Sequence, residues 1–139
     1  MYTVLAAMTP GLLAQAYFLG FGILLNGIVL CLWCMLIEAV VVLLRRPAHL
    51  SAELRRHLSD GSTLLTAWLI ALCLPPDLPA GVLAVAALAA VGLAKHAYGG
   101  LGQNVFNPAM VGYAVILLSF PALMATYPSV HMDGLSGAT

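Results

Sequence analysis

The chain has 139 residues, of which 63% are hydrophobic and 7% are charged, and its formal net charge at pH 7 is zero. A soluble domain carries about 25% charged residues because its surface faces water, so five basic and five acidic side chains exclude an ordinary soluble globule. Apolar surface must therefore face membrane lipid, and the zero net charge argues against a nucleic-acid partner.

The apolar segments predict an all-α fold, a polytopic membrane helix bundle with about five transmembrane helices. A helix needs about 20 apolar residues to cross roughly 30 Å of hydrocarbon, and shorter runs must borrow flanking residues. The third and fourth spans are joined by the turn-rich segment 75–79, so we expect a hairpin, with two half-helices as the alternative. In chain order, the expected spans are Val4–Leu19, Phe21–Leu44, Thr63–Leu74, Gly81–Ala94 and Pro108 to about Met124, the last with a stop near Pro121.

The basic residues predict the orientation of the bundle. Four of the five lie in the loop 45–61, which the positive-inside rule places in the cytoplasm. Lys95 returns to the same side two crossings later, so the tail 127–139 is expected on the periplasmic side. The missing polar lead-in before the first span suggests that residues 1–139 are the N-terminal part of a single membrane domain, truncated at both ends.

Glu38 is the one ionisable residue in the second expected span. Because a charge inside a membrane is costly, such a residue usually faces the interior of the bundle. One interpretation is that Glu38 snorkels or bonds a neighbouring helix. The other is that it takes up a cation or a proton, which makes it a candidate for the ion pathway.

A Gly/Asn-rich irregular segment precedes the last span. Irregular backbone at membrane depth must be buried in protein or line a cavity, and glycine and asparagine there suit close approach to a ligand. The alternative is an ordinary loop in which Asn107 caps the helix that begins at Pro108. The candidate ligand-binding residues are Gly99, Gly100, Gly102, Asn104 and Asn107.

Two further groups favour structural interpretations. Cys31 and Cys34 form a C-x-x-C pair inside an apolar helix with no second pair to complete a metal site, so we expect small apolar core residues. Lys95 and His96 are expected to mark the end of the fourth span, where Lys reaches the interface. A contact of Lys95 with a flavin or a partner protein is the alternative.

The chain ends in Asp133-Gly134-Leu135-Ser136-Gly137-Ala138-Thr139. By composition this is either an ordinary polar loop or an exposed peptide that a modifying enzyme acts on. Together with the run YGGLGQNVFNPAMVGY at 98–113, it resembles the D subunits of the Rnf electron-transport complexes and, less closely, the B subunits of the Nqr complexes. The resemblance covers nearly the whole chain, including Glu38 and Pro75-Pro76, although the family's proteins are more than twice as long.

The resemblance implies a covalent flavin. In the family, a flavin transferase attaches FMN to the last threonine of the motif through a phosphoester, so the acceptor here is Thr139. Asp133, Ser136, Gly137 and Ala138 then form the sequence that the transferase recognises. Riboflavin is a second flavin that the resemblance leaves open.

The resemblance also implies an activity: a membrane subunit of an ion-translocating oxidoreductase that passes electrons coupled to ion movement across the bacterial inner membrane. The other Rnf subunits are the expected partners. The B subunit of a sodium-pumping NADH:quinone oxidoreductase, a transporter or channel module with no redox role, and a fragment that serves only in assembly are the alternatives. The acceptor motif distinguishes the redox interpretations, because a passive channel has no need of it.

Overall fold

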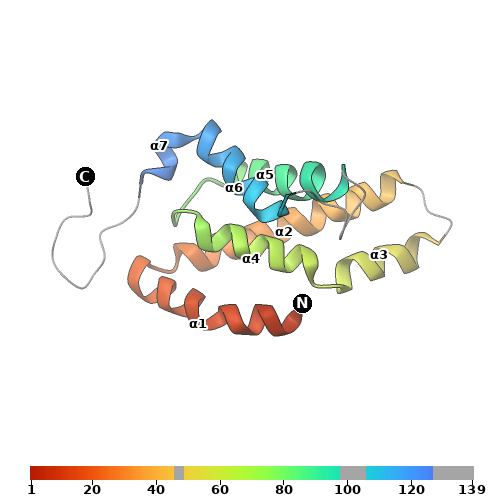
Figure 1. Ribbon diagram of the computed structural model, residues 1–139, viewed down its shortest axis with the longest axis horizontal. Helices are drawn as coiled ribbons and strands as arrows, with labels where there is room; N and C mark the ends of the chain where they lie inside the picture. The colour runs from red at the N-terminus through yellow and green to blue at the C-terminus, as the bar shows by residue number, and fades with distance from the viewer. Residues whose placement is uncertain (46–48, 98–105, 127–139) are drawn as a thin grey trace.

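A computed structural model describes residues 1–45, 49–97 and 106–126 of the chain (Figure 1). Every regular element in these ranges is helical. The elements are α1 (Tyr2–Leu19), α2 (Gly22–Leu44), α3 (Leu50–Ser59), α4 (Ser62–Cys73), α5 (Ala80–Ala87), the π-helix η1 (Leu88–His96), α6 (Pro108–Ser119) and α7 (Pro121–Met124).

Helix α2 is the longest element, and the other helices are arranged around it (Figure 1). It contacts α4 along one side and α5 with η1 along another, while α1 lies against both α2 and α4. Helix α6 packs over α4, α5 and η1, and the short α3 lies near the C-terminal end of α2. The ends of α2 and η1 and the start of α4 therefore meet beside α3.

Helix α2 has polar residues on its buried face and only apolar residues along its exposed face, the opposite of a surface helix in a soluble protein. Its buried face carries the two polar residues Asn26 and Glu38. Its exposed face is an unbroken apolar stripe with helical spacing, made of Leu25, Ile28, Leu32, Leu36, Val40 and Leu43. An exposed apolar face of this length suits lipid and not water.

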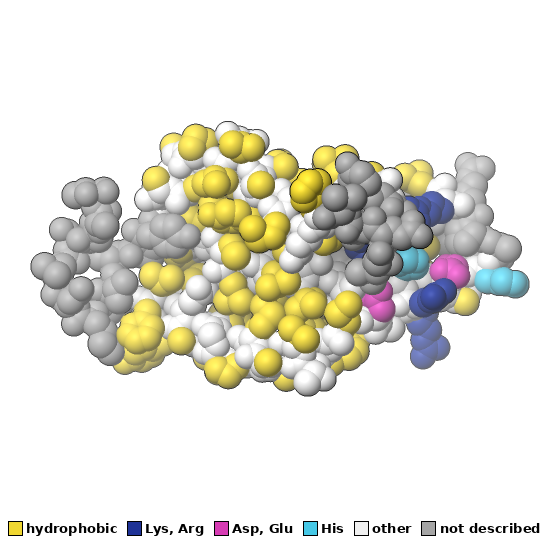
Figure 2. Space-filling view, in the orientation of Figure 1, with side chains coloured by type: hydrophobic (Ala, Val, Ile, Leu, Met, Phe, Trp, Pro, Cys, Tyr) yellow, Lys and Arg dark blue, Asp and Glu magenta, His cyan; other side chains and the backbone are white. Residues whose placement is uncertain are grey.

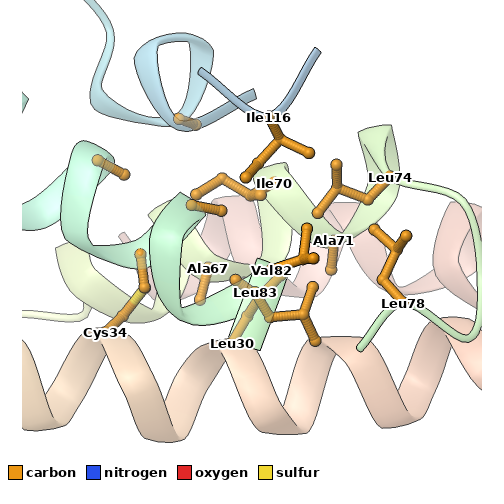
Figure 3. Packing of buried hydrophobic residues seen from close by; sticks show 14 of the residues in the cluster. Leu30, Cys34, Ala67, Ile70, Ala71, Leu74, Leu78, Val82, Leu83 and Ile116 are labelled. Carbon is orange, nitrogen blue, oxygen red and sulfur yellow. The ribbon is translucent and has the colours of Figure 1, made fainter. Parts of the chain in front are cut away.

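The core forms where α2, α4, α5 and α6 meet (Figure 3). Leu30 of α2, Ile70 of α4 and Ile116 of α6 are fully buried there. Glycines allow the close packing: a Cβ added at Gly27 would lie 2.6 Å from the Trp68 ring, and one at Gly112 would lie 2.9 Å from the Ala86 carbonyl oxygen. Small residues at such crossings are typical of helices that pack inside membranes.

The turn between α4 and α5 is fixed by a neutral hydrogen bond. The Asn26 side-chain amide of α2 donates to the Pro75 carbonyl oxygen at 2.8 Å, and both residues are buried. Asp77 adopts a positive φ of 62°, a conformation that Asp and Asn tolerate better than most residues. The sequence-predicted turn at 75–79 is confirmed.

Helix lengths support the expected spans only in part. α1 and α2 are long and apolar enough to cross a membrane. α4 and α6 have 12 residues each, about 18 Å, which is shorter than the hydrocarbon layer. The expected five crossings therefore stay a prediction.

Two sequence expectations about helix bounds need correction. The last span is predicted to run to about Met124 and to stop near Pro121. The stop near Pro121 is confirmed, because α6 ends at Ser119 and Pro121, which has no N–H to donate to the preceding turn, starts α7; the run of one helix to Met124 is wrong. The segment 45–61 is expected to be a loop, but it contains α3, which is an amphipathic helix.

Candidate functional site

Charged side chains gather at one end of the molecule, near α3 (Figure 2). Three elements supply them: the end of α2, α3 and the end of η1. Arg45, at the end of α2, donates to the backbone carbonyl of His96 at 3.0 Å and so joins α2 to η1. Within this end lies a group of polar residues, all buried except the half-buried His57, that we call the Glu38 cluster. It is made of Glu38, His57, Ser62, Thr63, Lys95 and His96.

The Glu38 carboxylate is the centre of the cluster and is completely buried. One of its oxygens, Oε2, accepts from Lys95 Nζ at 2.9 Å and from Thr63 Oγ1 at 3.1 Å. The expectation that Glu38 faces the bundle interior is confirmed. Of its two structural interpretations, snorkelling is wrong and bonding to neighbouring helices is right.

Lys95 is as deeply buried as its partner, with 1% of its side chain exposed. Its ammonium lies 2.9 Å from each of three oxygens: Glu38 Oε2, Ser62 Oγ and Thr63 Oγ1. The expectation that Lys95 extends to the membrane interface is therefore wrong. An interface position would leave the buried Glu38 charge without its counterion, and an unpaired buried charge is far costlier than a paired one.

The second carboxylate oxygen of Glu38, Oε1, faces two histidines. His57 Nδ1 lies 3.1 Å from it at hydrogen-bonding geometry. His96 Nε2 is also 3.1 Å away, within ion-pair distance, but neither His96 ring nitrogen has a hydrogen-bond partner among the described residues. The two imidazole centroids are 6.0 Å apart. Glu38 thus has a basic or hydroxyl partner on each of three neighbouring elements.

The π-helical geometry of η1 explains why Lys95 and His96 both point inward. In a π-helix the i→i+5 hydrogen bonds widen the turn, so consecutive residues lie closer together around the axis than in an α-helix. Both side chains are buried, although they are neighbours in the sequence. π-helical turns occur frequently at functional sites.

The start of α4 is shaped to present its two hydroxyls. Gly61 precedes the helix with a φ of 75°, a left-handed conformation that suits glycine. The Asp60 carboxylate accepts from the Ser62 backbone N–H at 2.8 Å and so satisfies one of the free N–H groups of the first turn. Ser62 and Thr63 are thereby held beside the Lys95 ammonium.

Sequence reasoning found Glu38 but missed three other members of the Glu38 cluster: His57, Ser62 and Thr63. His57 escapes notice when segment 45–61 is interpreted as a loop. A weak signal exists in its spacing of four residues from Glu53, which places both on one face of a helix. Ser62 and Thr63 gave no signal, because hydroxyls at the start of a helix are common for reasons of capping alone.

Most of the predicted flavin-binding residues lie outside the described residues: Gly99, Gly100, Gly102, Asn104, Asp133, Ser136, Gly137, Ala138 and Thr139. Asn107 is described, and its side-chain oxygen accepts from the Ala109 N–H at 3.0 Å. The helix cap expected before Pro108 is therefore present. A ligand-binding role for Asn107 stays a prediction.

The cysteines take the apolar positions expected of them. Cys34 is fully buried in the core between α2 and α4, and Cys31 packs against the same core from the next turn of α2 (Figure 3).

The chain is similar to known proteins over its whole length. All 139 residues match the NQR2, RnfD, RnfE family. The D subunit of the ion-translocating oxidoreductase complex of Vibrio cholerae serotype O1 (strain M66-2) is 44% identical over 124 residues, which are 89% of this chain and 34% of that protein. The protein of the same name from Yersinia pseudotuberculosis serotype O:1b (strain IP 31758) is 42% identical over 137 residues, 98% of this chain and 38% of that protein. The chain thus spans about a third of the length of these relatives.

Proposed function

Because the chain belongs to the NQR2, RnfD, RnfE family, we propose that it is the membrane part of a D subunit that couples electron transfer to ion movement. In this proposal the complete protein works with the other subunits of an Rnf-type complex and carries covalent FMN. Two of its relatives are named as subunits of ion-translocating oxidoreductase complexes.

The observation that carries the ion-transport part is the Glu38 cluster. A fully buried carboxylate, with a buried lysine and two histidines around it, lies inside a helix whose outer face is entirely apolar. Ionisable residues at such depth mark ion pathways and proton relays more often than they serve stability. Glu38 is the residue that we place on the path of the transported ion.

The flavin part is supported by the sequence motif at 133–139. Thr139 carries FMN through a phosphoester in this proposal, and a flavin transferase makes the bond after recognising Asp133, Ser136, Gly137 and Ala138. The glycine- and asparagine-rich segment before α6 contacts the flavin or another protein of the complex. When bound, the flavin supplies one- and two-electron chemistry, and the protein supplies its position.

The orientation belongs to the same proposal. In it, the 45–61 segment lies in the cytoplasm of a bacterial cell; the basic residues around α3 support this through the positive-inside rule. Five crossings of the inner membrane then bring Thr139 to the periplasmic side. The Glu38 cluster lies beside α3 and would open toward the cytoplasm.

Covalent flavin attachment is tested by flavin fluorescence in a denaturing gel. The protein, extended past residue 139, is expressed with a flavin transferase, and Thr139→Ala is compared with Thr126→Ala, a threonine outside the motif. We expect fluorescence in the wild type and in Thr126→Ala and none in Thr139→Ala. Covalent flavin that persists in Thr139→Ala would refute the attachment site.

The ion pathway is tested with Glu38→Gln in the assembled complex. We expect ion transport to fall while the covalent flavin stays attached. Asp77→Asn is the matched control, because Asp77 is an exposed acid at the opposite end of the bundle, in a conformation that asparagine also tolerates. Unchanged ion transport in Glu38→Gln would remove Glu38 from the mechanism.

The same cluster also fits an ion transporter with no redox role, because that function needs only the buried carboxylate and its partners. The flavin and ion-transport experiments together separate the alternatives. Loss of transport in Glu38→Gln, with no covalent flavin in any variant, would favour the transporter.

A further inference from the structure

We propose that His57 carries protons between the water around α3 and the Glu38 carboxylate. The inference rests on the proposed function only in placing Glu38 on an ion path. It adds a route to Glu38 and names the proton as the ion that uses it.

The inner side of this route is a direct hydrogen bond. His57 Nδ1 lies 3.1 Å from Glu38 Oε1, so no intervening group is needed for a proton to pass from the imidazole to the carboxylate. The bond joins two different elements, since His57 is on α3 and Glu38 is on α2. A rotation or displacement of α3 would therefore connect or disconnect the two groups.

The outer side of the route reaches water. His57 is 30% exposed, and its other ring nitrogen, Nε2, lies 3.7 Å from Glu53 Oε2, whose side chain is 40% exposed. The two residues line an open cavity of about 110 Å³ together with Val42 and Arg45. His57 therefore presents one nitrogen to a solvent-accessible acid and the other to a buried acid.

The other partners of Glu38 in the described residues do not offer such a route. Lys95 and Thr63 are buried and bond the other oxygen of the carboxylate, Oε2. His96 is buried as well, and neither of its nitrogens has a hydrogen-bond partner among the described residues. His57 alone among the partners is both bonded to Glu38 and appreciably exposed.

The proton transfer balances without any other reactant. A proton from water, passed by Glu53 or taken directly, binds His57 Nε2, and the Nδ1 proton moves to Glu38 Oε1. The products are a neutral Glu38 carboxyl group and a neutral His57 with its proton on Nε2. The starting tautomer returns when the transfer runs in reverse: Glu38 gives its proton back to Nδ1, and Nε2 releases its proton to water, so the relay carries protons in either direction.

Charged and titratable groups from three elements surround the imidazole. In the described residues they are Glu38 and Arg45 of α2, Glu53 of α3, and Lys95 and His96 of η1. The arrival of a proton on Glu38 also removes the counterion of Lys95, which links proton uptake to the rest of the cluster.

The experiment measures Glu38 protonation directly in the complete complex. Sealed membrane vesicles receive a pH jump, and the infrared C=O band of the protonated carboxyl group is followed in time, with its assignment to Glu38 made by its loss in Glu38→Gln. The variants are His57→Ala, with and without added imidazole, and the matched control His49→Ala, an exposed histidine at the start of the same helix.

We expect His57→Ala to slow protonation of Glu38 at least about ten-fold, in line with the effect of a positioned proton carrier, and imidazole to restore it. In His49→Ala, Glu38 should become protonated at the wild-type rate. A wild-type rate in His57→Ala, or a slow rate that imidazole does not restore, would overturn the proposal. If His57→Ala fails to assemble, His57→Gln retains an amide donor but cannot relay, so a slow rate in it supports the proposal and a wild-type rate overturns it.

The two proposals fail separately. Ion transport that is unchanged in Glu38→Gln would remove Glu38 from the ion path, yet the infrared rates would still decide whether His57 delivers protons to it. Normal Glu38 protonation in His57→Ala would remove the relay and leave Glu38 on the ion path.

Discussion

The two ends of α2 each contain a buried polar residue, and the two residues differ in the partners that they bond. Asn26 and Glu38 lie on the same buried face, with Leu30 and Cys34 between them at intervals of four residues. Asn26 makes one neutral hydrogen bond to the Pro75 backbone carbonyl at 2.8 Å. Glu38 has four side-chain partners from α3, α4 and η1, and three of those partners are basic residues.

The difference separates a structural polar group from one suited to transport. A bond from an amide to a fixed carbonyl holds the turn between α4 and α5 in one position and has no ionisable member. The Glu38 cluster contains groups that can exchange protons or change partners, and its members lie on four different elements, α2, α3, α4 and η1. Buried charge is weak evidence for stability, so its presence at one end of α2 points to a role other than holding the fold together.

The largest expected effect comes from Lys95→Met, which keeps an unbranched side chain one atom shorter than lysine and removes the charge. Glu38 would remain as a buried carboxylate without its counterion, and breaking a buried pair in this way costs about 3–5 kcal/mol. We expect the free energy of unfolding of the full-length protein in detergent, measured by denaturant titration, to fall by that order.

The matched control for Lys95→Met is the double variant Lys95→Met with Glu38→Gln, which has no unpaired charge. Its free energy of unfolding should recover most of the loss, because the penalty belongs to the unpaired carboxylate and not to the missing lysine. A double variant as unstable as Lys95→Met would show that Lys95 acts mainly through packing.

A smaller effect is expected at the other end of α2 from Asn26→Leu. The Pro75 carbonyl oxygen would lose its partner while buried, at a cost of about 1–3 kcal/mol in the free energy of unfolding. The assembled complex should still transport ions, in contrast to Glu38→Gln. Transport lost in assembled Asn26→Leu to the same extent as in Glu38→Gln would remove the distinction between the two ends.

The sequence predicted most of the helices and the position of Glu38, but it did not predict the partners of Glu38. The apolar runs and the Pro75–Pro79 turn located most of the helices, and the cost of a charge in an apolar span correctly placed Glu38 inside the bundle. The partners of Glu38 could not be found, because they come from positions 19 to 58 residues away, which only the tertiary arrangement brings together. Lys95 was misplaced for the same reason: a lysine at a helix end normally extends to the interface, and here a buried acid binds it instead.

Asn107 gives the smallest expected effect and extends the comparison to α6. Like Asn26, it bonds only backbone in the described structure, through Oδ1 to the Ala109 N–H at 3.0 Å, whereas the sequence also made it a candidate flavin contact. Asn107→Ala should cost about 1 kcal/mol in the free energy of unfolding, and Asn107→Ser should restore most of it, because serine caps helices nearly as well as asparagine.

Flavin fluorescence measured on the same two variants decides between the capping role and the flavin-contact role of Asn107. Fluorescence yield and spectrum that are normal in Asn107→Ser would assign the residue to capping. A changed flavin spectrum in Asn107→Ser, with stability intact, would show that the amide itself is needed and would place α6 beside the flavin.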